Sequence, residues 1–69
     1  MTQAERVMKY LEDYTSISSW EAFRDLGITR LAARISDLER EGIAFDRKRE
    51  AVTNRYGETV YYTRYSIAK

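Results

Sequence analysis

Apolar residues recur at three- and four-residue steps in the first part of the chain, which is the pattern of helices with one buried face. The first such segment begins at a capping box, in which Thr2 and Glu5 each satisfy a free backbone N–H, and runs to about Tyr14. Its buried face is expected to consist of Ala4, Val7, Met8, Leu11 and Tyr14. Residues 16–18 are a short β-branched stretch that can pair with a later strand.

Two further helices follow with little chain between them. A second capping box, from Ser18 to Glu21, begins a helix of about two turns that Gly27 ends in the left-handed conformation. Thr29 is the expected N-cap of the next helix, which Gly42 closes. The residues of these two helices expected in the core are Trp20, Phe23, Leu31, Ile35 and Leu38. Two helices joined by a turn that contains glycine make a helix-turn-helix.

After Ile43 the hydrophobic period changes to two, and β-forming residues dominate. Residues 54–57, Asn-Arg-Tyr-Gly, suit a type I turn followed by a glycine in the left-handed region, which closes a hairpin. The register that this turn sets pairs Phe45 with Ile67, Arg47 with Tyr65, and Lys48 with Arg64. The last pair is of like charge and needs an anion or Glu50 to relieve it. We therefore expect an α+β fold, a winged helix-turn-helix with three helices followed by a β-hairpin wing, in one domain over residues 1–69.

Composition narrows the function classes. The 69 residues include no Cys and no His, which excludes disulfides, Cys/His zinc sites and every Cys- or His-based triad. The paired carboxylates stand at adjacent or i,i+2 positions, where they do not converge on one substrate atom, and the hydroxyls have no base to activate them. We expect no enzyme, no cofactor and no metal. The polar first turn does not suit a signal peptide, and no apolar run approaches the roughly 20 residues of a membrane span, so we expect a soluble cytoplasmic protein.

Charge is distributed unevenly along the chain. The net charge is only +1. Residues 1–42 hold six basic and eight acidic side chains, whereas residues 43–69 hold six basic and three acidic ones. The positive charge is therefore concentrated in the predicted hairpin.

The third helix and the hairpin carry residues suited to nucleic acid. A recognition helix buries one stripe and presents short or hydrogen-bonding side chains to the major groove on the other side. Arginines there can reach guanine or phosphate, and an arginine at a turn tip suits a narrow minor groove. The residues expected to contact DNA are Thr29, Arg30, Ala33 and Arg34 from the helix, and Arg47, Lys48, Arg49, Asn54 and Arg55 from the hairpin.

Each of these assignments has a structural alternative. The arginines of the third helix, Arg30 and Arg34, can instead form ion pairs with Asp37, Glu39 or Glu41 on a solvated helix face, since partners at i,i+3 spacing such as Arg34/Asp37 and Asp37/Arg40 are present. The basic residues of the hairpin can simply protect a sheet edge from aggregation. Tyr61, Tyr62 and Tyr65 lie in a strand, where cross-strand packing is the ordinary explanation and base stacking the unusual one.

Leu26 to Ile43, with the sequence LGITRLAARISDLEREGI, resembles the helix-turn-helix core of winged-helix DNA-binding proteins, and specifically the small helix-turn-helix proteins of bacteriophages and prophages. Those proteins carry a similar Gly-Ile-Thr-Arg-Leu run and a similar Asn-Arg-Tyr-Gly turn. The spacing between Gly27 and the first buried residue of the third helix is shorter than in the commoner winged-helix repressors, so their base-contact positions do not transfer by counting. The resemblance implies binding of double-stranded DNA, in transcriptional regulation or as an accessory factor in recombination or excision.

Two other kinds of partner stay open at this point. The low net charge and the acidic first 42 residues favour a module that docks on another protein, such as a host nucleic-acid enzyme, because DNA affinity comes mainly from phosphate neutralisation. A homodimer is the second alternative, since a small domain has little core to hold all of Tyr10, Tyr14 and Trp20.

Overall fold

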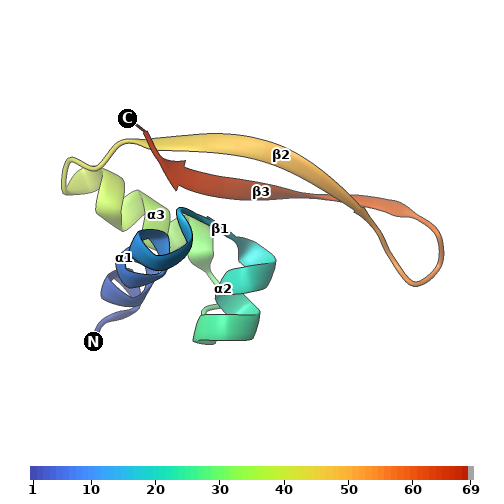
Figure 1. Ribbon diagram of the computed structural model, residues 1–69, viewed down its shortest axis with the longest axis horizontal. Coiled ribbons are helices and arrows are strands. Elements are labelled where there is room, and N and C mark those ends of the chain that lie inside the picture. Colours follow the sequence, from blue (N-terminus) through green and yellow to red (C-terminus); the bar gives the residue numbers. More distant parts are fainter. Residues whose placement is uncertain (69) are drawn as a thin grey trace.

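The chain folds into three helices and a three-stranded antiparallel sheet, as shown by a computed structural model that describes residues 1–68 (Figure 1). The elements in chain order are α1 (Gln3–Tyr14), β1 (Ser16–Ser18), α2 (Ser19–Leu26), α3 (Leu31–Arg40), β2 (Phe45–Thr53) and β3 (Thr59–Ile67). The predicted order of three helices followed by a hairpin is confirmed, and the segment at residues 16–18 adds a third strand.

Both predicted capping boxes are present. The Thr2 hydroxyl accepts a hydrogen bond from the Glu5 N–H at 3.1 Å, and the Glu5 carboxylate accepts one from the Thr2 N–H at 2.8 Å. Ser18 and Glu21 make the same reciprocal pair at the start of α2. Gly27 ends α2 with a φ of 69°, a left-handed conformation that glycine adopts without strain. Local sequence therefore sets where these two helices begin and where α2 ends.

The predicted N-cap of α3 is wrong. Arg30, and not Thr29, is the residue before the first turn, and it makes no side-chain capping bond. The cause lies in the preceding turn, where the Ile28 N–H donates to the Ala22 carbonyl at 3.0 Å and the Ile28 side chain is buried. Because Ile28 is buried in this turn, the helix does not begin until Leu31. Thr29 therefore lies one residue before the N-cap position.

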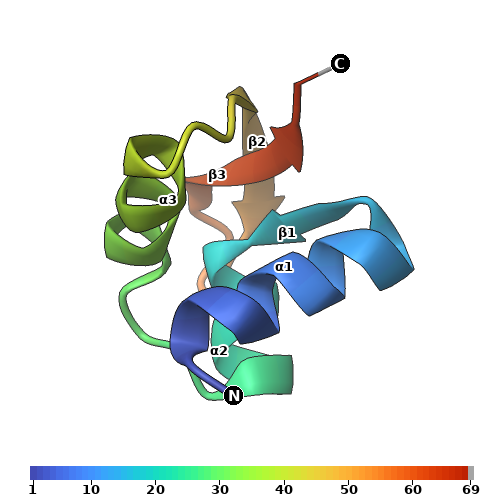
Figure 2. The same cartoon turned by 90° about the vertical axis from the view of Figure 1, so that its left-hand side faces the viewer.

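The hairpin has the register that the turn predicted. The pairs Phe45–Ile67, Arg47–Tyr65 and Lys48–Arg64 all occur. The strand order is β1-β3-β2, so β3 lies in the middle and pairs with β1 over three residues only. Viewed from the end that carries the N-terminus, the helices pack beside and below the sheet (Figure 2).

The core forms where the three helices meet the base of the sheet. Its fully buried side chains include Val7 of α1, Ile17 of β1, Ile28 before α3 and Ile35 of α3. Leu31 and Leu38 are buried as predicted, and the strands β2 and β3 contribute Phe45 and Tyr65 to the same core cluster. The core therefore holds α3 against both α1 and the base of the hairpin.

Three aromatic residues expected to pack in the core lie at the surface. Trp20 and Phe23 are 61% and 56% exposed, and Tyr14 is also exposed. The short helix α2 buries Ala22 fully, and Trp20 and Phe23 lie roughly 160° and 100° around the helix from it. The isoleucines of β1 and of the turn before α3 occupy the core instead.

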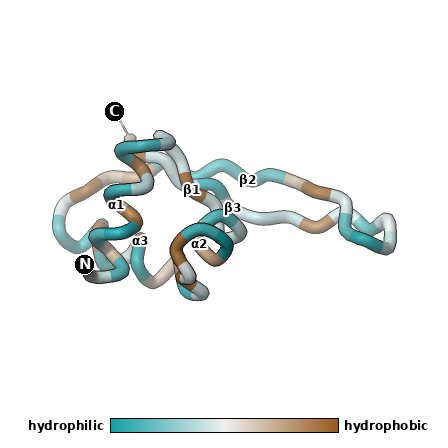
Figure 3. The backbone as a smooth tube through the Cα atoms, turned by 60° about the horizontal axis from the view of Figure 1, so that its bottom comes forward, coloured by the Kyte–Doolittle hydropathy of each residue, from teal (hydrophilic) through white to brown (hydrophobic). Residues whose placement is uncertain are grey.

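The hairpin of β2, the turn at residues 54–58 and β3, called the wing below, projects far beyond the helices (Figure 1). It accounts for the elongated shape, with extents of 39 × 24 × 20 Å. Its tip is hydrophilic, with a short hydrophobic segment in each strand behind it (Figure 3). The pair Val52–Val60 lies within the wing with both side chains exposed. The outer wing is thus held by its own strand pairing and by no helix.

Candidate nucleic-acid interface

Two exposed residues lie directly before the first turn of α3. Thr29 and Arg30 are exposed, and Ala33 is half-buried one turn later. Within residues 1–68 Arg30 has no ion-pair partner. The start of α3 therefore presents a free guanidinium next to a small side chain that permits close approach.

Arg34 and Arg40 share one carboxylate. The Nε atom of Arg34 lies 3.0 Å from the Asp37 carboxylate, in an ion pair that lacks hydrogen-bond geometry, and Arg40 pairs with the other oxygen of Asp37. Arg34 also donates a hydrogen bond to the Gln3 side chain of α1 at 3.0 Å. The intrahelical pairing considered as an alternative is therefore present, and Arg34 is held in place from two sides.

Arg47 connects the wing to α3. Its guanidinium donates two hydrogen bonds to the Glu39 carboxylate, at 3.1 and 2.8 Å, and lies 5.4 Å from the ring centre of Tyr65. The hydrogen bonds from Arg47 hold the pKa of Glu39 below its ordinary value, and those to Glu39 raise the pKa of Arg47. The pairing of Glu39 with Arg47 was not expected from the sequence, because it depends on the angle between wing and helix.

The next basic residues of the wing are differently placed. Arg49 lies over the Tyr61 ring, 4.2 Å from its centre, and Lys48 and Arg55 are exposed. None of these three cations has an ion-pair partner in the part of the chain that the structure describes. A guanidinium stacked on an aromatic face keeps its N–H edges available for other acceptors. Arg47 and Arg49 thus lie on the same face of β2 but differ in charge pairing. Glu39 neutralises Arg47, whereas no carboxylate among residues 1–68 pairs with Arg49.

Asn54 shapes the tip of the wing. Its side-chain oxygen accepts hydrogen bonds from the N–H groups of Tyr56 at 2.9 Å and Glu58 at 3.0 Å. Its amide donates to the Glu58 carboxylate at 3.3 Å, and Gly57 takes the left-handed conformation that the turn requires. The turn leaves Arg55 and Tyr56 at the surface, Tyr56 with 80% of its area exposed.

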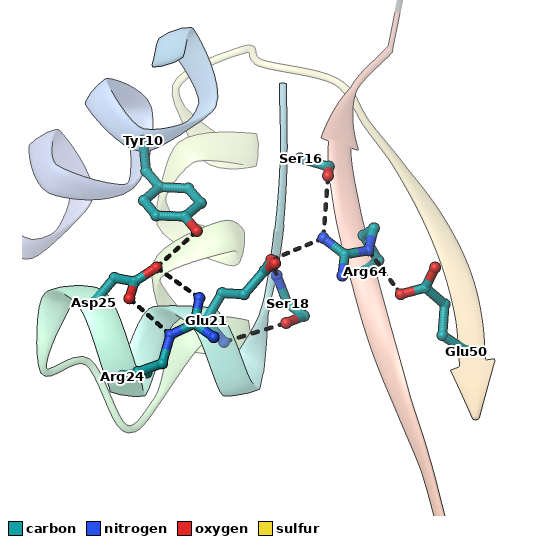
Figure 4. Close-up of polar contacts among 8 residues, drawn as sticks. All are labelled: Tyr10, Ser16, Ser18, Glu21, Arg24, Asp25, Glu50 and Arg64. Atoms are coloured by element: carbon teal, nitrogen blue, oxygen red, sulfur yellow. Dashed lines mark hydrogen bonds and ion pairs between the residues drawn. The ribbon is translucent and has the colours of Figure 1, made fainter. Parts of the chain in front are cut away.

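Arg64 is the polar centre at the base of the wing (Figure 4). It donates to Glu50 at 2.6 Å, to Glu21 at 2.7 Å and to the Ser16 hydroxyl at 3.1 Å. The bonds to Glu50 and Glu21 raise the pKa of Arg64, and the bond from Arg64 holds the pKa of Glu50 low. By accepting this bond, Glu50 offsets the repulsion between Arg64 and the like-charged Lys48 opposite it, as expected from the sequence. The second carboxylate, Glu21, comes from the α2 capping box and was not expected.

A second polar cluster joins α1 to α2 (Figure 4). The Tyr10 hydroxyl donates to Asp25 at 2.8 Å, and Arg24 donates to the same carboxylate. Burial, together with the hydrogen bond to Asp25, raises the pKa of Tyr10 to about 12. The bonds from Arg24 and Tyr10 lower the pKa of Asp25. Tyr10 is therefore a structural residue and not part of an exposed aromatic surface.

Residues 1–68 contain neither a cluster of metal-binding side chains nor a helix that could span a membrane. This stretch holds no group of three Asp, Glu, His or Cys side chains placed to bind a metal ion. None of its helices has the length and hydropathy needed to cross a bilayer.

Nearly the whole chain matches a known family. The family described as winged helix-turn-helix domain matches residues 2–69. No curated protein and no solved structure matches the chain. Domains of this kind generally bind nucleic acid and are typically not enzymes. The helix-turn-helix of α2 and α3 and the projecting hairpin are the parts that such a domain requires, and the chain belongs to the winged helix-turn-helix domain family.

Proposed function

We propose that this protein binds double-stranded DNA, with α3 in the major groove and the wing against the backbone and the adjacent minor groove. The observation that supports it is where the free cations lie. Among residues 1–68, five basic side chains have no ion-pair partner, and four of them are on the start of α3 or on the wing: Arg30, Lys48, Arg49 and Arg55, the fifth being Arg6 of α1. Phosphate contacts by such groups release counterions and supply most nonspecific DNA affinity.

In the proposed complex the start of α3 lies nearest the bases. Thr29 and Arg30 face the groove, Ala33 permits close approach, and Arg34 is oriented by Gln3 and Asp37. If Arg30 reads guanine with two hydrogen bonds, Arg30→Ala costs about 1–3 kcal/mol at the preferred site and relaxes the preference there.

The wing supplies the second set of contacts. Lys48 and Arg49 alternate across the two faces of β2, so an edgewise approach brings both to phosphates. Arg55 at the tip suits the minor groove, and Asn54 contributes by holding the turn that presents Arg55.

The cellular role that we propose is transcriptional regulation, or accessory binding in recombination or excision, in a bacteriophage or prophage. This proposal rests on the resemblance of residues 26–43 and of the wing turn to the small phage proteins. The proposed role implies a cytoplasmic location, because the DNA concerned lies there. Selection of preferred sites from the genome that encodes the chain tests it. Sites in promoters would favour regulation, and sites at recombination junctions would favour excision.

The direct test of DNA binding is fluorescence anisotropy with a labelled duplex of random sequence, from about 50 to 200 mM salt. We expect saturable binding that weakens steeply with salt. Lys9→Ala is the control, because Lys9 lies on α1 near Asp13 and outside the proposed interface, and its affinity should match that of the unaltered protein. Absence of binding at the lowest salt would contradict the proposal.

A further inference from the structure

An open groove of about 680 Å³ lies between α1 and the C-terminal end of α3. Its apolar lining comes from α1, from the last turn of α3 and from the connection to β2, and it includes Ala4, Met8, Leu38 and Ile43. Leu38 is buried beneath it, and the other three are partly exposed. The groove therefore offers apolar surface that the fold itself does not cover.

The rim of this groove is acidic. Glu5, Glu12 and Glu41 line it, and Lys9 is its one basic lining residue beyond the start of the chain. Lys9 lies 3.9 Å from the Asp13 carboxylate, which offsets its charge. Within the described part of the chain, Glu12 and Glu41 have no ion-pair partner. The groove thus combines an apolar floor with two carboxylates that are free to meet cations.

The groove and the proposed DNA interface share no residue. The groove lies at the end of the molecule that carries the N-terminus, whereas the wing tip lies at the other end (Figure 1). Thr29 and Arg30 precede α3, whereas Glu41 follows it. Arg34 of the proposed DNA interface reaches Gln3 beside the groove, but the groove lining itself includes none of the proposed DNA contacts, and an acidic rim disfavours DNA.

We propose that this groove binds a short cationic amphipathic helix of a partner protein. A cleft between two helices with an apolar floor takes the apolar face of a third helix. From Ala4 to Glu12 the lining advances roughly 12 Å along α1, so a partner segment of two to three turns matches it. Apolar side chains at i, i+3 and i+4 spacing would fill the floor, where the flexible thioether of Met8 adapts to their shape. Lysine or arginine on the flanks would pair with Glu12 and Glu41.

The test uses two synthetic 14-residue peptides, each capped and labelled at one end. Both carry one leucine stripe at helical spacing; the flanking positions are lysine in one peptide and glutamate in the other. Anisotropy without DNA should show saturable binding of the lysine peptide and much weaker binding of the glutamate peptide. Amide chemical shifts of the protein should change for residues of the groove and not for residues of the wing.

Charge variants then identify the rim. Glu12→Gln with Glu41→Gln should weaken binding of the lysine peptide about three- to tenfold, the effect of losing two exposed ion pairs. Glu58→Gln, which removes a carboxylate at the wing tip, is the matched control and should leave affinity unchanged. Replacing Glu12 and Glu41 by lysine should reverse the preference toward the glutamate peptide.

Three results would overturn the proposal: equal binding of both peptides, binding that the glutamine variants do not weaken, and self-association that these variants abolish. The last would mean that a second copy of the chain occupies the groove. Because all lysine-peptide measurements are made without DNA, they stand whatever the outcome of the DNA-binding test.

Discussion

Arg47 and Arg49 offer a matched comparison, because they lie two residues apart on the same face of β2 and differ in their partners. Arg47 is bound by both oxygens of Glu39, and Arg49 rests on the Tyr61 ring with its N–H groups free. A phosphate would have to displace Glu39 from Arg47, whereas it can approach Arg49 directly. We therefore expect Arg49→Gln and Arg47→Gln to change DNA binding in different ways.

The magnitude follows from the number of free cations. Each phosphate neutralised adds about 0.9 to the slope of log affinity against log salt for duplex DNA. Arg30, Lys48, Arg49 and Arg55 together predict a slope of about −3.6, which is roughly a 150-fold loss of affinity between 50 and 200 mM salt. Arg49→Gln should reduce the slope to about −2.7, so that this loss is about 3.5-fold smaller. Arg47→Gln combined with Glu39→Gln removes a neutral pair and should leave the slope near −3.6.

The assay is anisotropy with one random duplex for all proteins, at five or more salt concentrations. The double variant is needed beside Arg47→Gln, because the single change leaves the Glu39 charge exposed toward DNA. Equal loss of slope in Arg49→Gln and in the double variant would refute the distinction between a free and a paired arginine. An unaltered slope in Arg49→Gln would refute the assignment of phosphate contact to Arg49.

Three further predictions concern the scaffold. Ile35→Ala should lower the free energy of unfolding by about 2–5 kcal/mol in urea titrations, because Ile35 of α3 is fully buried in the core. Ser36→Ala, at an exposed position of the same helix, should change it by under about 0.5 kcal/mol. Thr15→Gly should stabilise the protein by about 1 kcal/mol in the same titrations, because Thr15 holds a φ of 69° that a β-branched residue adopts only under strain; no gain would mean that the threonine is compensated locally. Glu50 has a folded pKa below its ordinary value of 4.5, so its stabilising bond from Arg64 is present above about pH 4.5 and is lost as the pH falls through the lowered pKa. Glu50→Gln should therefore flatten the fall of melting temperature below pH 4.5, and an unchanged acid profile would contradict this origin.

Features that depend on a few consecutive residues could be predicted from the sequence. The capping box of Thr2 and Glu5 and the wing turn at residues 54–57 are complete in themselves, and the turn alone fixed the register of nine strand pairs. The pairing of Arg34 with Asp37 was foreseen for the same reason, since both lie on one helix.

Features that depend on how elements pack could not be predicted. Trp20 and Phe23 are apolar and close to Ala22, but an eight-residue helix cannot show from its own sequence which side the core will cover. Glu39 and Glu21 meet Arg47 and Arg64 only because helices and wing approach at a particular angle, with the second pair separated by 43 residues. Those contacts determine which basic residues remain free. The sequence therefore indicated which elements carry the candidate residues, but not which of these residues are already ion-paired.

The length of the wing makes it a lever. A nine-residue strand spans roughly 30 Å, so a rotation of about 10° at the base would carry the tip through roughly 5 Å. The base is fixed by three strand pairs to β1 and by ion pairs from β2 to α3 and from β3 to α2. The distance along DNA between the contacts of α3 and those of Arg55 is set by these pairings at the base, and changes at Glu39 or Glu21 would shift which site spacings the protein accepts.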